Sequence, residues 1–135
     1  MYDVLVAEDH PVNQLLIREI LTSIGCRVTM ADTGQKALEE ISARDFDLVI
    51  MDNLMPVMTG LEAIGCIRAR KDWKARIPII ALTASSLPED ETAYKAHGIE
   101  AFMTKPLDMN EVIETVKRLG KQGRRIRDAA HSTTE

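Results

Sequence analysis

Leu48-Val49-Ile50-Met51-Asp52 is the stretch of the sequence that decides the fold. Its four consecutive apolar residues are typical of a central strand that helices cover on both faces. Val4 to Ala7 and Ile79 to Leu82 are similar runs, and shorter ones lie at 27–30 and 101–103. Amphipathic helical patterns separate these runs, at about residues 11–24, 33–44, 60–70, 89–97 and 108–119. Strands and helices that alternate in this way predict a parallel α/β sheet.

The composition limits the class of protein. With 135 residues, of which 45% are hydrophobic and 28% charged, the chain is expected to be globular with a sizeable core. Its longest apolar runs have four or five residues, whereas a membrane span needs about 20, so we expect a cytoplasmic location without membrane insertion. Cys26 and Cys66 have no second cysteine or histidine at metal-ligand spacing, so we expect two reduced thiols and no zinc or redox site.

Charge is unevenly distributed along the chain. Residues 1–120 carry 13 Lys or Arg against 19 Asp or Glu, whereas residues 121–135 carry four basic and two acidic side chains. The acidic body argues against nucleic acid as a direct ligand. We therefore expect a domain over residues 1–120 and a basic, flexible C-terminal tail or linker stub over residues 121–135.

Polar side chains follow the predicted central strands. In a parallel sheet the carboxyl ends of the strands meet at one edge, where ligands bind. The residues at these positions are two carboxylates after the first strand, one after the third, a hydroxyl after the fourth and a lysine after the fifth. They are Glu8, Asp9, Asp52, Thr83 and Lys105. We expect these side chains to lie close together.

This set of residue types points to metal-assisted phosphoryl chemistry. Three neighbouring carboxylates repel one another unless a proton or a cation neutralises them, and oxygen donors without histidine or thiolate suit Mg2+. A carboxylate can also attack phosphorus to form an aspartyl-phosphate. Lys105 and Thr83 are then suited to neutralise or donate to the phosphoryl oxygens.

Four motifs carry a family resemblance: Glu8-Asp9; Val49-Ile50-Met51-Asp52-x-x-Met55-Pro56 with Gly60 four residues further; Leu82-Thr83-Ala84; and Lys105-Pro106. On these motifs the sequence resembles the receiver domain of two-component response regulators, most of all the receivers of hybrid sensor histidine kinases. The resemblance implies a flavodoxin-like, CheY-like fold. This is a doubly wound five-stranded parallel sheet of order 2-1-3-4-5 with five helices.

The resemblance also implies a role for each site residue. Asp52 would accept a phosphoryl group from the phosphohistidine of a histidine kinase or a histidine phosphotransfer protein. Mg2+, with Mn2+ as a possible substitute, would be held by Asp9, Asp52 and the backbone carbonyl of Leu54, and by Glu8 through water. Beyond its own phosphorylation and dephosphorylation the domain would catalyse nothing, although a hybrid kinase containing it would be a protein-histidine kinase.

Further positions matched by the resemblance concern the switch and the loops. Thr83 and Lys105 would contact the phosphoryl oxygens. Thr83 and Phe102 would form the switch: their movement on phosphorylation would remodel the surface of the fourth helix, fifth strand and fifth helix. That surface would then bind a downstream protein or form a phosphorylation-dependent dimer. The loop residues with an expected structural role are Pro56, Gly60 and Pro106.

The first helix suggests where a phosphodonor docks. At about 100° per residue, one arc of this helix is apolar and is expected to face the sheet. It consists of Leu16, Ile17, Ile20, Leu21 and Ile24. Leu15 falls nearly opposite this arc and Val12 at its border. The resemblance implies that phosphohistidine donors dock on the first helix beside the acidic edge, so both residues are candidates for contact with the donor.

Three other functions remain as alternatives. A haloacid-dehalogenase-like phosphatase would need a second aspartate where Leu54 stands. A nucleotide or flavin binder would need a glycine-rich loop after the first strand, where the sequence reads Glu8-Asp9-His10-Pro11. A degenerate receiver that serves as a phosphorylation-independent docking module is the third alternative, although all the signature positions are filled.

Overall fold

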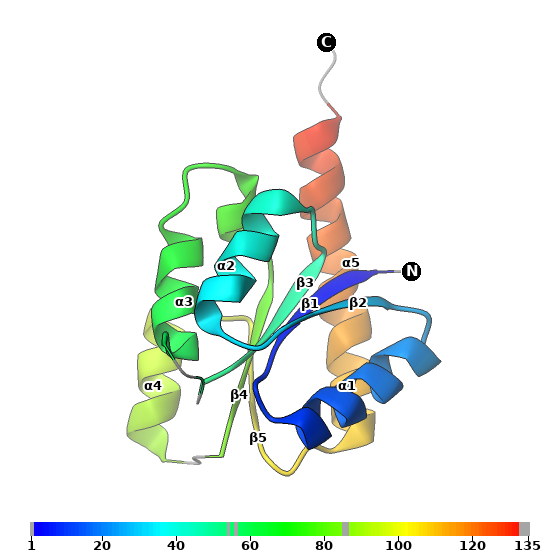
Figure 1. The fold of residues 1–135 in the computed structure, drawn as a ribbon. Helices are drawn as coiled ribbons and strands as arrows, with labels where there is room; N and C mark the ends of the chain where they lie inside the picture. Colours follow the sequence, from blue (N-terminus) through cyan, green and yellow to red (C-terminus); the bar gives the residue numbers. More distant parts are fainter. Residues whose placement is uncertain (1, 54, 56, 85–86, 133–135) are drawn as a thin grey trace.

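The computed structural model describes residues 2–53, 55, 57–84 and 87–132. In this part of the chain, five parallel strands form one sheet of order β2-β1-β3-β4-β5 (Figure 1). Their bounds are β1 Asp3–Ala7, β2 Arg27–Ala31, β3 Leu48–Asp52, β4 Ile79–Thr83 and β5 Ala101–Thr104. The predicted fold class and strand order are therefore confirmed.

Helices connect the strands and cover both faces of the sheet. Figure 1 shows α1 and α5 on one face, and α2 and α3 on the other with α4 beside them. The helices are α1 Pro11–Ser23, α2 Gly34–Ala43, α3 Gly60–Arg68, α4 Pro88–Ala96 and α5 Met109–His131, with a short 3-10 helix, η1, at Trp73–Arg76. None of the described helices is both long enough and apolar enough to cross a membrane.

The continuous apolar runs arise because each central strand serves two cores. In β3, Val49 and Met51 belong to the core beneath α2 and α3, whereas Leu48 and Ile50 belong to the core beneath α1 and α5. Since successive side chains of a strand point to opposite faces, both sets of positions must be apolar.

The turns between elements follow the local sequence signals. Thr33 and Asp108 accept hydrogen bonds from the backbone at the starts of α2 and α5, which is the usual role of Thr and Asp at a helix N-cap. Gly25 and Gly98 end α1 and α4 in the left-handed region, with φ of 85° and 81°. These two glycines therefore fix where α1 and α4 end and where the chain turns back towards the next strand.

The C-terminal segment differs from the expectation of a helix ending near residue 119 followed by a flexible tail. Instead, α5 is continuous to His131 and rises beyond the sheet (Figure 1). Asp47, which is 0% exposed, accepts bonds of 2.8 and 2.9 Å from the Arg124 guanidinium. Arg127 bonds Asp3 at 2.8 Å, and Gly123 lies against the backbone of Asp47, where a Cβ would overlap its carbonyl oxygen. The basic residues thus attach the last turns to the body of the domain.

Candidate functional site

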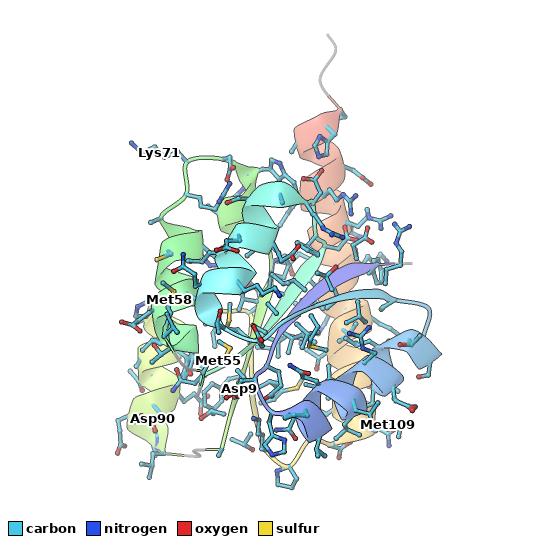
Figure 2. The ribbon with its side chains drawn as sticks, viewed as in Figure 1. Asp9, Met55, Met58, Lys71, Asp90 and Met109 are labelled. Atoms are coloured by element: carbon cyan, nitrogen blue, oxygen red, sulfur yellow. The ribbon has the colours of Figure 1, made fainter. Side chains whose placement is uncertain are left out.

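The carboxyl ends of β1, β3, β4 and β5 meet at one edge of the sheet, the lower edge in Figure 1. Figure 2 shows Asp9 and Met55 near this edge and Lys71 near the opposite one. The residues predicted from the strand ends all lie at this edge: Glu8, Asp9, Asp52, Thr83 and Lys105. The parallel topology is what brings together residues that are far apart in the sequence.

Three carboxylates form the acidic part of the site. One oxygen from each of Glu8, Asp9 and Asp52 lies within 4.8 Å of the others. Glu8 and Asp52 are buried, whereas Asp9 is exposed. The cluster therefore combines two desolvated carboxylates with one that faces solvent.

Lys105 neutralises part of this charge. Its Nζ lies 3.1 Å from Oδ1 of Asp52 and 3.2 Å from Oε1 of Glu8. Burial and the negative charge of Glu8 raise the pKa of Asp52 to about 6, although Lys105 opposes the shift. Burial lowers the pKa of Lys105, but the bonds and charges of Asp52 and Glu8 outweigh it and raise that pKa above its ordinary value. One ammonium therefore does not fully balance the carboxylates.

The loop after β1 fixes Glu8 through residues that the sequence analysis did not single out. Oε2 of Glu8 accepts a 3.2 Å bond from the backbone N–H of His10, and its carbonyl accepts a 2.6 Å bond from Nε2 of Gln14. Nδ1 of His10 accepts a 3.2 Å bond from Val12 N–H and so caps α1. The His-Pro pair ahead of a helix was the available signal, since Pro11 occupies the first helical turn.

The loop after β3 is held against the end of that strand. The backbone carbonyl of Asn53 accepts a 3.0 Å bond from Gly60 N–H, and its Oδ1 accepts a 3.2 Å bond from Leu61 N–H. A Cβ on Gly60 would overlap the carbonyl oxygen of Asp52, so glycine is required for α3 to start this close to the strand. Leu54 and Pro56 lie outside the described residues, and their roles stay predictions.

The loop after β5 presents Lys105 to the carboxylates. Its backbone N–H donates to the carbonyl of Thr83 at 2.8 Å, which joins the ends of β5 and β4. The Lys105–Pro106 peptide bond is cis. Pro106 follows Lys105 directly, at the point where the chain turns towards α5.

The two predicted switch residues occupy different environments. Thr83 is buried at the end of β4, and it lines a cavity of about 430 Å³ between the ends of β3 and β4 and the helices α3 and α4. Phe102 is half-buried, and its ring centroid lies 5.5 Å from that of Tyr94 in α4. Tyr94 lines the same cavity as Thr83. It was not identified from the sequence, because a tyrosine in a short helix carries no signal of its own.

The first helix exposes more apolar surface than its pattern predicts. Val12 and Leu15 are 66% and 62% exposed, as expected for residues off the buried arc. Leu16 is 44% exposed, so its predicted place against the sheet is wrong. The buried stripe of α1 is only as wide as Ile17, Ile20 and Leu21, and Leu16 lies on its flank. Val12, Leu15 and Leu16 together form an exposed apolar patch, called the α1 patch below.

The family model of the response regulator receiver domain matches residues 4–117. The chain belongs to this family. Its fold agrees with that of the receiver domain of sensor histidine kinase PA1611 from Pseudomonas aeruginosa PAO1, with a TM-score of 0.82 and 34% identity over 89% of this chain and 98% of that one. That crystal structure has a magnesium ion coordinated in the active site cleft. Chemotaxis protein CheY4 of Vibrio cholerae gives a TM-score of 0.82 at 30% identity, covering 88% and 98% of the two chains.

The relatives of this receiver domain include both long and short proteins. Sensor histidine kinase GacS of Pseudomonas protegens is 35% identical over 118 residues, which make up 84% of this chain and 12% of that protein. Polar-differentiation response regulator DivK of Brucella ovis is 31% identical over 114 residues, covering 84% of this chain and 92% of that protein. The chain therefore spans about an eighth of the kinase but nearly all of the short regulator, and the family and hybrid-kinase resemblance predicted from the motifs are confirmed.

The donor set of this receiver domain fits a hard divalent cation. Its candidate ligands are carboxylate oxygens close enough to share one ion, and no softer ligand stands among the described residues of the cluster. Burial and the negative charge of Glu8 raise the pKa of Asp52, and a bound cation would offset that charge. Asp9 is exposed and gives such an ion a solvent-facing side, which suits Mg2+ because this ion keeps several of its waters.

Proposed function

We propose that this protein is a working phosphoacceptor: Asp52 receives a phosphoryl group from the phosphohistidine of a histidine kinase or a histidine phosphotransfer protein. The observation that carries this proposal is the contact of Lys105 with Asp52 at 3.1 Å, beside two further carboxylates. A nucleophilic carboxylate, a fixed ammonium and a set of metal ligands are the groups that phosphoryl transfer to an aspartate needs.

The transfer step uses groups of this chain for charge and orientation. An Oδ atom of Asp52 forms a bond to phosphorus as the phosphorus–nitrogen bond to the donor imidazole breaks, and the departing imidazole nitrogen takes up a proton. Lys105 and the hydroxyl of Thr83 stabilise the negative charge on the transferred oxygens. The burial of Asp52 excludes competing water and strengthens these interactions.

Mg2+ is the cofactor that the acidic cluster would hold, with Mn2+ as a substitute. Asp9, Asp52 and the backbone carbonyl of Leu54 would bind it directly, and Glu8 through water. When bound, the ion neutralises charge on the carboxylates and on the phosphoryl oxygens. Lys105 and the His10 N–H each contact one oxygen of Glu8 and so hold its carboxylate beside the cluster.

The output of the switch is proposed to be a protein contact. Thr83 turns towards the phosphoryl group and Phe102 moves inward, which changes the surface of α4, β5 and α5 for a downstream protein or a second copy of the chain. We propose that this event takes place in the cytoplasm, either in a free regulator or in the cytoplasmic part of a kinase, and the similarity to receivers of histidine kinases supports this proposal. The α1 patch is the proposed contact for the phosphodonor.

Intact mass after incubation with acetyl phosphate and Mg2+ tests the proposal. The wild type should gain one phosphoryl group that hydroxylamine removes. Asp52→Ala, or the wild type with a chelator, should gain none, while the control Asp72→Ala, an exposed aspartate paired with Arg70, should behave as wild type. A folded wild type that gains nothing under these conditions would favour a phosphorylation-independent docking module.

A further inference from the structure

The Tyr94 side chain is buried with its hydroxyl unpaired. Tyr94 is 3% exposed, and among the described residues its hydroxyl is the one buried side-chain oxygen or nitrogen without a hydrogen-bond partner. A buried hydroxyl that makes no bond lowers stability compared with a phenylalanine of the same shape. The unpaired oxygen therefore lowers the stability of the resting state.

Tyr94 stands at the phosphorylation site rather than in a remote part of the core. Its side chain lines the cavity of about 430 Å³ that Thr83 and Asn53 also line. Its ring packs against Phe102 with 5.5 Å between the ring centroids, so Tyr94 contacts one of the two residues proposed to switch and shares a cavity with the other. It also belongs to the core that contains Met51 of β3, the strand that ends in Asp52.

The hydroxyl is available as a proton donor. Burial, together with the carboxylates of Asp52 and Asp90, raises the pKa of Tyr94, so the group remains O–H throughout the physiological range. A donor facing a negatively charged region is best satisfied by an oxygen acceptor. Thr83 offers such an oxygen on the wall of the same cavity.

We propose that Tyr94 is a positioning residue of the phosphorylated state: its hydroxyl donates a hydrogen bond to Oγ of Thr83 and thereby turns the Thr83 proton towards the phosphoryl group on Asp52. This inference rests on the proposed function, since it needs a phosphoryl group at Asp52. Two linked O–H donors polarise each other, so the bond from Thr83 to the phosphoryl oxygen becomes stronger. Phe102 contributes packing but no hydroxyl, and Tyr94 supplies the donor from α4 instead.

The proposal predicts effects of opposite sign in the two states. Tyr94→Phe keeps the ring and its contact with Phe102 but removes the unpaired oxygen. The resting variant should unfold at the same temperature as the wild type or a higher one. In the phosphorylated state it loses one hydrogen bond, which corresponds to a weakening of about three- to tenfold. If Tyr94 only filled space, Tyr94→Phe would not weaken the phosphorylated state, and its effects on the two states would not differ in sign.

The experiment measures binding of beryllofluoride, a stable mimic of the phosphoryl group, to the full chain with saturating Mg2+. Tyr94→Phe should bind it about three- to tenfold more weakly and should lose the phosphoryl group from acetyl phosphate faster by a similar factor. The matched control is Tyr2→Phe, because Tyr2 packs against Gly120 of α5, away from the site. This control should match the wild type in both measurements.

A double-mutant cycle locates the effect. In a Thr83→Val background, which lacks the hydroxyl but keeps the shape, Tyr94→Phe should cause no further loss. An equal loss in both backgrounds, or a Tyr94→Phe variant that matches the wild type, would overturn the inference while leaving the proposed function intact. A wild type that binds neither beryllofluoride nor a phosphoryl group would overturn both.

Discussion

Lys105 and Asp52 form an ion pair of 3.1 Å between residues at the ends of two strands that are separated in the sheet by β4. The same ammonium lies 3.2 Å from Glu8, at the end of a third strand. The pair therefore ties β1, β3 and β5 together at the edge where the chemistry is proposed. It also leaves net negative charge, because Asp9 adds a carboxylate that Lys105 does not contact among the described residues.

Replacement of Lys105 should slow phosphorylation. Lys105→Met keeps much of the side-chain volume but removes the charge that stabilises the transferred oxygens, and we expect acetyl phosphate to react with Asp52 about 10–100 times more slowly. Intact mass against time at fixed Mg2+ measures the rate. Lys71→Met is the control, because Lys71 is exposed at the opposite edge of the sheet (Figure 2). Equal rates for Lys105→Met and the wild type would argue against a role for this ammonium.

The raised pKa of Asp52 predicts how stability depends on pH without metal. With a pKa of about 6 in the folded protein against 3.8 as the reference, the folded state binds more protons than the unfolded chain between these values. The stability contribution of Asp52 therefore falls as pH rises from about 4 to about 6 and stays low above that.

Asp52→Asn should remove this dependence. In a chelator at pH 7.5, the variant should be more stable than the wild type by about 1–3 kcal/mol, with the difference vanishing near pH 4. Urea unfolding at several pH values measures it. A variant that is less stable than the wild type at pH 7.5 would contradict the predicted sign.

Removal of one proposed metal ligand should separate metal binding from folding. Asp9 is exposed, so Asp9→Asn should fold normally yet bind Mg2+ at least about tenfold more weakly, since one charged ligand is lost. Mg2+ at 100 times its dissociation constant should stabilise the wild type by about 2.7 kcal/mol. The variant should gain less at the same concentration, whereas Glu39→Gln, an exposed acid on α2, should gain as much as the wild type. Identical gains for all three proteins would exclude Asp9 as a ligand.

The sequence was sufficient for the parts of the molecule governed by the parallel topology. Residues that follow central strands must reach the same edge, so Glu8, Asp52 and Lys105 could be placed together without coordinates. Gly60 could be given a structural role only through the resemblance, because its overlap with the Asp52 carbonyl is a tertiary contact.

The structure differs from the sequence-based expectations where contacts between residues far apart in the sequence determine the local conformation. The excess of basic residues after position 120 suggested a flexible tail, but Asp47 and Asp3 hold Arg124 and Arg127 of a continuous helix. These partners lie more than 75 residues away in the sequence. Leu16 is exposed because the buried stripe of α1 is narrower than the apolar arc that the sequence pattern defines.

The Arg124 contact should contribute to the stability of the whole domain. Among the described residues, Arg124→Ala leaves the fully buried Asp47 carboxylate with the Asp3 N–H and the longer contact to Arg127 as its partners. We expect a loss of about 2–3 kcal/mol in the free energy of unfolding, together with lower helix content by circular dichroism. Arg125→Ala removes an exposed arginine from the same turn and should change stability by less than about 0.5 kcal/mol. Equal stability of the two variants would show that the last turns of α5 do not depend on Asp47.

The α1 patch should affect transfer from a protein donor but not from a small one. Leu15→Ala removes apolar surface that a docking helix would bury, so phosphotransfer from the cognate phosphohistidine protein should slow by about three- to thirtyfold. The reaction with acetyl phosphate should be unchanged, because Asp52, Lys105 and the proposed metal ligands are untouched. Leu87→Ala is the matched control, since Leu87 is 54% exposed ahead of α4 and outside the patch. If both variants slow transfer equally, or neither does, the donor contacts another surface. If Leu15→Ala alone slows the protein reaction, then the exposure of Leu15 and Leu16 beside the acidic edge reflects donor recognition.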